Sequence, residues 1–272
     1  MLNSSRKLVE TSRLPPNEAR LLIAHALGME RAWLMGHIDD PLDLASVERA
    51  RALLGRRRAG EPIAYILGRR EFHGLDLTVT ADVLIPRPET ELLVDLALER
   101  IGDQSRRVLD LATGSGAIAI AIACGAPRAE VWATDASSAA LAVARANAAR
   151  HAPRVHIVES DWFAALSGER FDLVATNPPY VAADDPHLAQ GDVRFEPRAA
   201  LVGGADGLDC IRRIVDEARE HLTAGGWLLF EHGHDQAQAS RRLLEDAGYL
   251  EAASWLDLAG IPRVSGGRCR AG

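Results

Sequence analysis

The chain has 272 residues and a mass of 29.3 kDa, which is large for a single hydrophobic core and predicts more than one domain. Hydrophobic residues make up 47% and charged residues 25%, which excludes a largely disordered chain, a collagen-like fibre and a disulfide-stapled miniprotein. The net charge of −7 is uneven, with +2 on residues 1–80 and −9 on the rest, so the acidic main body argues against binding along a nucleic-acid backbone.

Localisation and metal binding are constrained by what the sequence lacks. The three cysteines stand far apart and form no C-x-x-C pair, which indicates a reducing compartment and no zinc site. The N-terminus has no apolar core of a secretory signal, and the longest apolar stretch, residues 109–126, is interrupted and too short for a membrane span. We expect a cytoplasmic protein with no membrane partner and no metal.

The first 60 or so residues predict helices. Asn17 is a candidate N-cap for a run over residues 19–27 with apolar side chains at helical spacing, and Gly28 marks its end. A second amphipathic run spans residues 44–54, and the cluster Arg56–Arg58 follows it as a solvated helix end. Residues 1–70 therefore read as a helical domain.

The next twenty residues read as a linker. Between Glu71 and Thr80 the apolar period becomes two, with Gly74 as the turn signal, which predicts a short β-hairpin. Residues 84–91 follow as a stiff connector, because each proline fixes its own φ and keeps the preceding residue out of the helical region. Hairpin and connector, residues 71–90, lead into a domain over residues 91–272.

Strands and helices alternate in this last domain. Five strands are predicted at residues 107–111, 131–134, 155–158, 171–176 and 226–231. Helices are predicted near residues 117–125, 137–150 and 207–223, and residues 250–256 and 263–270 are candidates for an antiparallel pair. The alternation predicts βαβ units, and hence a doubly wound α/β domain with a parallel sheet.

A glycine-containing loop, residues 112–116, joins the first of these strands to a helix. Gly114 and Gly116 permit a tight turn and let a ligand approach the backbone and the free N–H groups of the helix. Asp135 closes the next strand about 20 residues further on, where a carboxylate can accept hydrogen bonds from ribose hydroxyls. The pattern fits either S-adenosylmethionine or a nicotinamide dinucleotide.

Two features favour S-adenosylmethionine. Asp110 precedes the loop near the end of the strand, where its carboxylate can face the positive sulfonium and amino group of that cofactor. Asp161 and Trp162 follow the third strand, where a polar group and an aromatic face can hold an adenine ring.

The segment Asn177-Pro178-Pro179-Tyr180 directly follows the apolar strand 171–176. Prolines cannot continue a strand ladder, so the chain leaves the sheet in a rigid turn at its carboxyl edge, where open α/β folds bind ligands. The Asn177 side-chain oxygen and the Pro178 carbonyl can accept both N–H bonds of an NH2 group, while Tyr180 can stack on a planar amide or base. We therefore predict metal-free methyl transfer to a planar nitrogen, with Asn177, Pro178 and Tyr180 as the catalytic residues.

Taken together, these segments resemble the HemK/PrmC family, the N5-glutamine methyltransferases of peptide chain release factors. The matching blocks cover essentially the whole chain and are Glu71–Gly74, Ile85–Thr90, Asp110–Gly116, Asn177–Tyr180, Phe195–Arg198, Asp206–Leu208, Glu231–Gly233 and Gly260–Arg263. The resemblance implies a seven-stranded, Rossmann-like S-adenosylmethionine-dependent methyltransferase domain behind a helical domain that helps to grip the substrate. That substrate is the glutamine in the Gly-Gly-Gln loop of class 1 release factors. We expect a monomer that binds no nucleic acid directly.

The resemblance also assigns residues to roles. It implies cofactor contacts for Ala112, Thr113, Gly114, Ser115, Gly116, Asp135, Trp162 and Asn177, to which the reasoning on adenine adds Asp161. It implies that Asn177, Pro178, Pro179 and Tyr180 hold the glutamine and that Phe72, Arg87, Pro88, Glu89 and Thr90 line its pocket. Ala112 departs from the family, which commonly has glycine there, and its methyl group is expected at worst to weaken cofactor binding.

The motifs are also compatible with other functions. A ribosomal-protein glutamine is a substrate that the motifs cannot separate from a release factor. An adenine-N6 DNA methyltransferase shares Asn177–Tyr180, although the acidic catalytic half disfavours it. A nicotinamide oxidoreductase explains the glycine loop and leaves Asn177–Tyr180 without a role, whereas a non-catalytic binding module has no need of Asn177. The cluster Glu231–Asp235 holds two histidines two positions apart, which point different ways after a strand and so predict no metal site.

Overall fold

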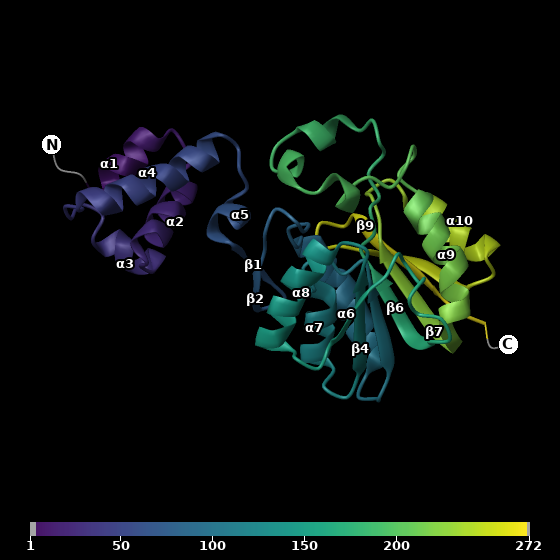
Figure 1. Cartoon of the computed structure of the whole chain (residues 1–272). Helices are drawn as coiled ribbons and strands as arrows, with labels where there is room; N and C mark the ends of the chain where they lie inside the picture. Colours follow the sequence, from purple (N-terminus) through teal and green to yellow (C-terminus); the bar gives the residue numbers. More distant parts are fainter. Residues whose placement is uncertain (1–3, 271–272) are drawn as a thin grey trace. The chain divides into compact units, whose positions relative to one another are not determined.

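The computed structural model describes residues 4–270 (Figure 1), so residues 1–3 and 271–272, the outer ends of the predicted domains, lie outside it. The chain divides into two compact units, one of residues 1–69 with 190–195 and one of residues 70–189 with 196–272. The predicted hairpin and connector belong to the second unit. Within residues 4–270, no helix is long and apolar enough to cross a membrane.

The first unit is helical, as predicted. Its helices are α1 (Ser5–Ser12), α2 (Pro16–Leu27), α3 (Arg31–Gly36), α4 (Leu44–Arg58) and α5 (Ile63–Leu67). They enclose a core in which Leu22, Ile23 and Leu34 are fully buried. Gly28 ends α2 in the left-handed region at φ 66°, which confirms the predicted stop.

Two expectations in this unit are wrong. Asn17 does not cap α2, because the helix starts one residue earlier at Pro16, whose fixed φ suits the first helical position; Asn17 accepts a hydrogen bond from Arg31 instead, at 3.2 Å. Arg56 and Arg58 are exposed, as expected of a solvated helix end, but the side chain of Arg57 is only 19% exposed and pairs with Glu18 and Asp192, both at 2.8 Å. Asp192 lies in the 190–195 segment, which therefore packs with the helices.

The second unit holds the predicted seven-stranded sheet, and its strand order is β5-β4-β3-β6-β7-β9-β8. The strands are β3 (Arg107–Leu111), β4 (Glu130–Asp135), β5 (His156–Glu159), β6 (Phe171–Thr176), β7 (Leu222–Glu231), β8 (Leu250–Leu256) and β9 (Pro262–Arg268). Strands β5, β4, β3, β6 and β7 pair in parallel, and β9 runs antiparallel to both β7 and β8. A separate hairpin of β1 (Arg69–Phe72) and β2 (Leu75–Thr78) confirms the predicted turn around Gly74.

Helices cover both faces of this sheet (Figure 1). They are α6 (Glu91–Ile101), α7 (Ala117–Gly125), α8 (Ser138–His151), α9 (Asp209–His221) and α10 (Ala237–Asp246). Alternate strand residues face opposite sides: Val108 packs in the core with α6, α7 and α8, whereas Leu109 packs in the core with α9 and α10. The sequence reasoning missed α6 and α10, and the predicted connector contains a 3-10 turn at Pro88–Thr90 that runs directly into α6.

Candidate functional site

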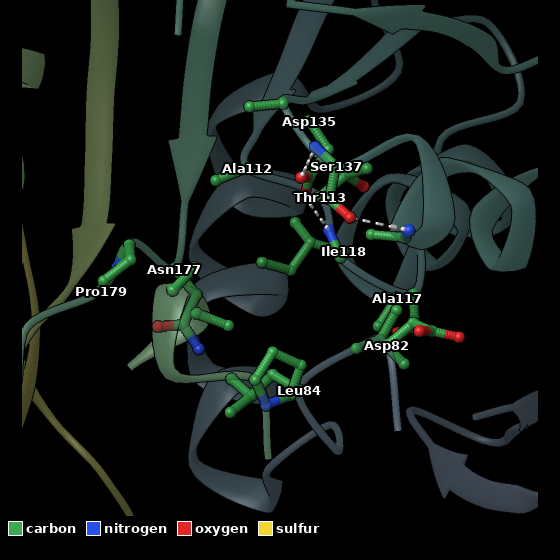
Figure 2. A pocket seen from close by; sticks show the side chains of 18 of the residues that line it. Asp82, Leu84, Ala112, Thr113, Ala117, Ile118, Asp135, Ser137, Asn177 and Pro179 are labelled. Carbon is green, nitrogen blue, oxygen red and sulfur yellow. Dashed lines mark hydrogen bonds between the residues drawn. The ribbon is translucent and has the colours of Figure 1, made fainter. Parts of the chain in front are cut away.

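A cavity of about 270 Å³ lies in the second unit at the carboxyl ends of β3, β4 and β6 (Figure 2). Its walls come from four loops and the connector before α6. The lining residues are Asp82, Val83, Leu84, Pro86, Arg87, Thr90, Ala112, Thr113, Gly114, Ser115, Ala117, Ile118, Asp135, Ala136, Ser137, Ala140, Ser160, Asp161, Trp162, Asn177, Pro179, Pro197, Ala199 and Ala200.

The glycine loop is held against β4 by Asp135. One carboxylate oxygen of Asp135 accepts the Gly114 N–H and the other accepts the Ser137 N–H, each at 2.9 Å. Gly116 caps α7 at φ 84°, and a Cβ there would lie 3.0 Å from the Ile120 side chain. Glycine suits both the left-handed φ and this close packing at the start of α7.

Asp110 is buried behind the loop and is absent from the cavity lining. Its carboxylate accepts hydrogen bonds from the Thr113 hydroxyl and from the Ala119 N–H, and burial raises its pKa to about 7. Its second oxygen, Oδ1, has no hydrogen-bond partner within residues 4–270. In this structure Asp110 therefore braces the loop and the start of α7, rather than facing the cavity as expected.

Ser160, Asp161 and Trp162 form the wall that follows β5. The Ser160 hydroxyl donates to the Trp162 carbonyl at 2.7 Å and accepts the Ala165 N–H at 3.0 Å, which fixes Trp162 in the left-handed region at φ 50°. Arg213 lies outside this wall, 3.3 Å from the Asp161 carboxylate. The turn thus brings an aromatic residue and an acidic residue into the lining of one cavity, and the Arg213 guanidinium lies 6.0 Å from the centre of the Trp162 ring.

The turn after β6 is packed against a glycine-rich segment. The Tyr180 carbonyl accepts a hydrogen bond from the Gln236 side chain at 3.0 Å. Gly207, at φ 78°, lies so close that a Cβ there would collide with the Tyr180 carbonyl oxygen. Gly203 approaches the Pro179 carbonyl in the same way. The predicted rigid turn is therefore clamped by backbone that has no room for side chains.

A buried hydrogen-bond network lies under this turn. The Asn177 side-chain nitrogen donates to the Thr90 hydroxyl at 3.2 Å, and Thr90 donates to the Glu231 carboxylate at 2.6 Å. The Tyr180 hydroxyl donates to the other Glu231 oxygen at 3.0 Å. Burial raises the pKa of Glu231, although the two donors and the charge of Arg263 oppose that shift. Burial and the nearby carboxylate also raise the pKa of Tyr180.

Glu196 ties the connector before α6 to the loop after β6. Its side chain is fully buried, accepts the Ile85 N–H at 3.1 Å and pairs with the Arg87 guanidinium. The adjacent Pro197 lines the cavity. Glu196 therefore joins two cavity walls that are more than a hundred residues apart in the sequence.

The structure brings most of the predicted site residues around one cavity. Those in its lining are Ala112, Thr113, Gly114, Ser115, Asp135, Asp161, Trp162, Asn177, Pro179, Arg87 and Thr90. Those outside the lining are Gly116, Pro178, Tyr180, Phe72, Pro88 and Glu89. Gly116 caps α7, Tyr180 contacts Glu231 beneath the turn, and Phe72 is buried in the core with Leu77 and Leu93 because the hairpin packs against α6 and α8.

Several lining residues escape the sequence reasoning. Asp82 and Val83 precede the proline-rich connector, Leu84 is its first residue, and Ile118 is on α7. Pro197 belongs to the block 195–198, and Glu231, which holds Thr90 and Tyr180, belongs to the block 231–233. Both blocks are among those that match the family, and this match is the sequence signal that could have identified Pro197 and Glu231.

The arrangement suits a nucleoside with a charged tail. Asp135 ends β4, where ribose hydroxyls can reach its carboxylate; Trp162, an aromatic residue that suits a base, lines the same cavity, as does the loop before α7. These donors and acceptors fit S-adenosylmethionine. Across the cavity, Asn177 offers an amide to a second ligand.

Known proteins match the chain along most of its length. The family model described as PrmC N-terminal domain matches residues 2–68, and the one described as Methyltransferase small domain matches residues 88–193. Release factor glutamine methyltransferase of Bordetella pertussis is 53% identical over 264 residues, 96% of this chain and 98% of the relative. The protein of that name from Burkholderia pseudomallei is 54% identical, covering 97% of this chain and 96% of the relative.

Among solved structures, a methyltransferase from Pyrococcus furiosus shares the fold. It has a TM-score of 0.56 at 18% sequence identity, with 83% of this chain and 99% of that chain covered.

Proposed function

We infer that this chain, which belongs to the release factor glutamine methyltransferase family, transfers a methyl group from S-adenosylmethionine to the side-chain nitrogen N5 of a glutamine. The glutamine is the one in the Gly-Gly-Gln motif of class 1 peptide chain release factors. The observation that carries the proposal is the Asn177–Tyr180 turn at the edge of a cavity that fits the cofactor. A release factor as substrate places the enzyme in the cytoplasm, where we propose that it acts as a monomer.

The cofactor half of the cavity is assigned to the loops after β3, β4 and β5. Asp135 holds the ribose, Trp162 and Asp161 hold the adenine, and the backbone of residues 112–116 approaches the amino-acid tail. S-adenosylmethionine, when bound, supplies a methyl group that passes to the amide nitrogen as its bond to sulfur breaks and a bond to nitrogen forms.

The residues after β6 prepare the nitrogen for that transfer. An amide nitrogen is a poor nucleophile because its lone pair is delocalised. The Asn177 oxygen and the Pro178 carbonyl accept its two N–H bonds, which orients the NH2 group and leaves its lone pair facing the methyl group. Tyr180, whose hydroxyl is tied to Glu231, holds the turn in place, and the surplus proton leaves to solvent.

The test is to incubate the full chain with tritiated S-adenosylmethionine and, separately, a class 1 release factor, ribosomal proteins and DNA. We expect label on the release factor, lost when the Gly-Gly-Gln glutamine is replaced by alanine. Label only on a ribosomal protein, or only on DNA, would keep the chemistry and overturn the substrate.

A variant separates chemistry from binding. Asn177→Ala is expected to lower kcat by about two to three orders of magnitude, the usual loss for a group that stabilises only the transition state. Its melting temperature and its dissociation constant for S-adenosylmethionine are measured beside kcat to show that the cavity is intact. Near-normal turnover by this variant would sink the mechanism.

A further inference from the structure

Asn177 and Glu231 lie side by side at the carboxyl edge of the sheet. The register pairs Thr176 of β6 with Phe230 of β7 in parallel, and Asn177 and Glu231 each come one residue later. Thr90, at the start of α6, reaches both of them. Glu231 is 1% exposed and Thr90 is 4% exposed, so solvent does not compete for their hydrogen bonds.

When Glu231 is ionised, the number of available protons fixes the directions of these hydrogen bonds. An ionised Glu231 only accepts, and both of its oxygens receive a donor, from Thr90 at 2.6 Å and from Tyr180 at 3.0 Å. Thr90 has one hydroxyl proton and gives it to Glu231. Its oxygen can then only accept, so the Asn177 amide must turn its nitrogen toward Thr90, where the distance is 3.2 Å.

This orientation decides what Asn177 offers on its other side. The oxygen and nitrogen of a planar amide lie on opposite sides, so committing the nitrogen to Thr90 leaves the oxygen as the acceptor for a ligand. An amide turned over would present its own NH2 to the NH2 of the substrate, and neither group can accept there. A short asparagine side chain with no fixed partner would populate both orientations.

We propose that Thr90, held by Glu231, is a positioning residue that turns the Asn177 amide so that its oxygen accepts from the reacting nitrogen. This inference rests on the proposed function, and it gives Thr90 a task other than direct contact with the glutamine. Thr90 touches neither reacting atom in this role; its effect passes through Asn177.

The matched pair Thr90→Ser and Thr90→Val tests this in the full chain. Serine keeps the hydroxyl, whereas valine keeps the shape and loses it. We expect kcat of Thr90→Ser to exceed that of Thr90→Val by at least tenfold, with similar dissociation constants for S-adenosylmethionine. The melting temperature of each variant shows whether the pair differs in folding.

The same pair in an Asn177→Ala background separates positioning from a structural role. Without an amide to orient, the ratio of the two kcat values is expected to fall to about one, because effects that act through one group are not additive. A ratio near one in the chain with Asn177, or a ratio that persists in the Asn177→Ala chain, would overturn the proposal.

Two measures keep this result distinct from failure of the proposed function. If the wild-type chain labels a ribosomal protein or DNA instead of the release factor, the substrate assignment fails and the same ratios are measured on the labelled substrate, since each offers an NH2 group. Independently of activity, the side-chain NH2 of Asn177, observed by NMR, is expected to hold one slowly exchanging proton in Thr90→Ser. Persistence of that protection in Thr90→Val would overturn the proposal.

Discussion

Gly207→Ala is the substitution whose effect the structure defines most sharply. Gly207 adopts φ 78°, and a Cβ there would collide with the Tyr180 carbonyl oxygen and lie 2.7 Å from the Gln236 side-chain nitrogen. Gly168 provides the matched control, because its φ is 81° and a Cβ there would meet no heavy atom within 4 Å. Both alanine variants share the backbone strain, and only one has the collision.

The expected magnitudes follow from these two contributions. A left-handed backbone costs a residue with a Cβ about 1–2 kcal/mol, partly offset because alanine restricts the unfolded chain. Forcing an extra carbon into packed structure adds about 1–3 kcal/mol. Gly168→Ala is therefore expected to lower the free energy of unfolding by about 1 kcal/mol or less, and Gly207→Ala by about 2–4 kcal/mol.

The assays are urea unfolding and steady-state methylation. Displacing the Tyr180 carbonyl moves the Asn177–Tyr180 turn, so Gly207→Ala is expected to lower kcat at least tenfold, because reacting groups misplaced by about 1 Å can lose 10²-fold in rate. Gly168 lies outside the cavity lining, and its variant is expected to keep wild-type kcat. Equal losses of stability and of kcat in the two variants would refute the reasoning that the turn is clamped by Gly207.

Three further substitutions test other contacts. Because burial raises the Asp110 pKa to about 7, the folded chain keeps a proton there that the unfolded chain releases near pH 4, and the free energy of unfolding should fall by about 3 kcal/mol as pH rises from 4 to 7. In Asp110→Asn this fall in stability with pH should be absent, as measured by the urea unfolding midpoint between pH 4 and 7. The same dependence on pH in both chains would contradict the assignment of the buried proton to Asp110. Ala112 adopts φ 59°, a left-handed conformation that strains a residue with a Cβ. Ala112→Gly should therefore add about 1 kcal/mol to the free energy of unfolding and bind S-adenosylmethionine more tightly, as measured by calorimetry. No gain in stability or in affinity would count against backbone strain at Ala112. Arg57→Ala should lower the free energy of unfolding by about 1 kcal/mol and speed proteolysis within residues 190–195, which Asp192 ties to Arg57. A cleavage rate equal to that of the wild type would show that this segment is not held by the ion pair.

The strands of the sheet could be predicted because their residues obey a simple rule. A strand covered by helices on both faces is apolar at nearly every position, and Phe171–Thr176 has that pattern between two polar segments. The start of α6 was harder, because Pro86 and Pro88 mark a connector while the helix begins only three residues after the second proline. Prolines fix where a helix cannot continue, and they leave open how soon one can begin.

The contacts under the turn could not be predicted for a different reason. Glu231 ends an apolar strand and looks like one of several polar residues in 231–235. Its task depends on which strand lies beside β7, and the register that sets it next to Asn177 is a property of the whole sheet. The pair Arg57 and Asp192 is similar, since a contact between residues 135 apart leaves no local pattern. Local sequence identifies the residue types, and tertiary pairing assigns their partners.

The position of the cavity follows from the order of the strands. The sheet runs β5-β4-β3 in one direction from β3 and β6-β7 in the other, so the chain reverses its winding between β3 and β6. The helix after β3 packs on one face of the sheet, whereas α9, the next helix after β6, packs on the other. The loops at Ala112 and Asn177 therefore part at this point and leave a crevice, as doubly wound sheets do. The proposed cofactor residues lie on the β3 side and the proposed amide-binding turn lies on the β6 side, so in the proposed reaction a methyl group needs to cross only the gap between two adjacent strands.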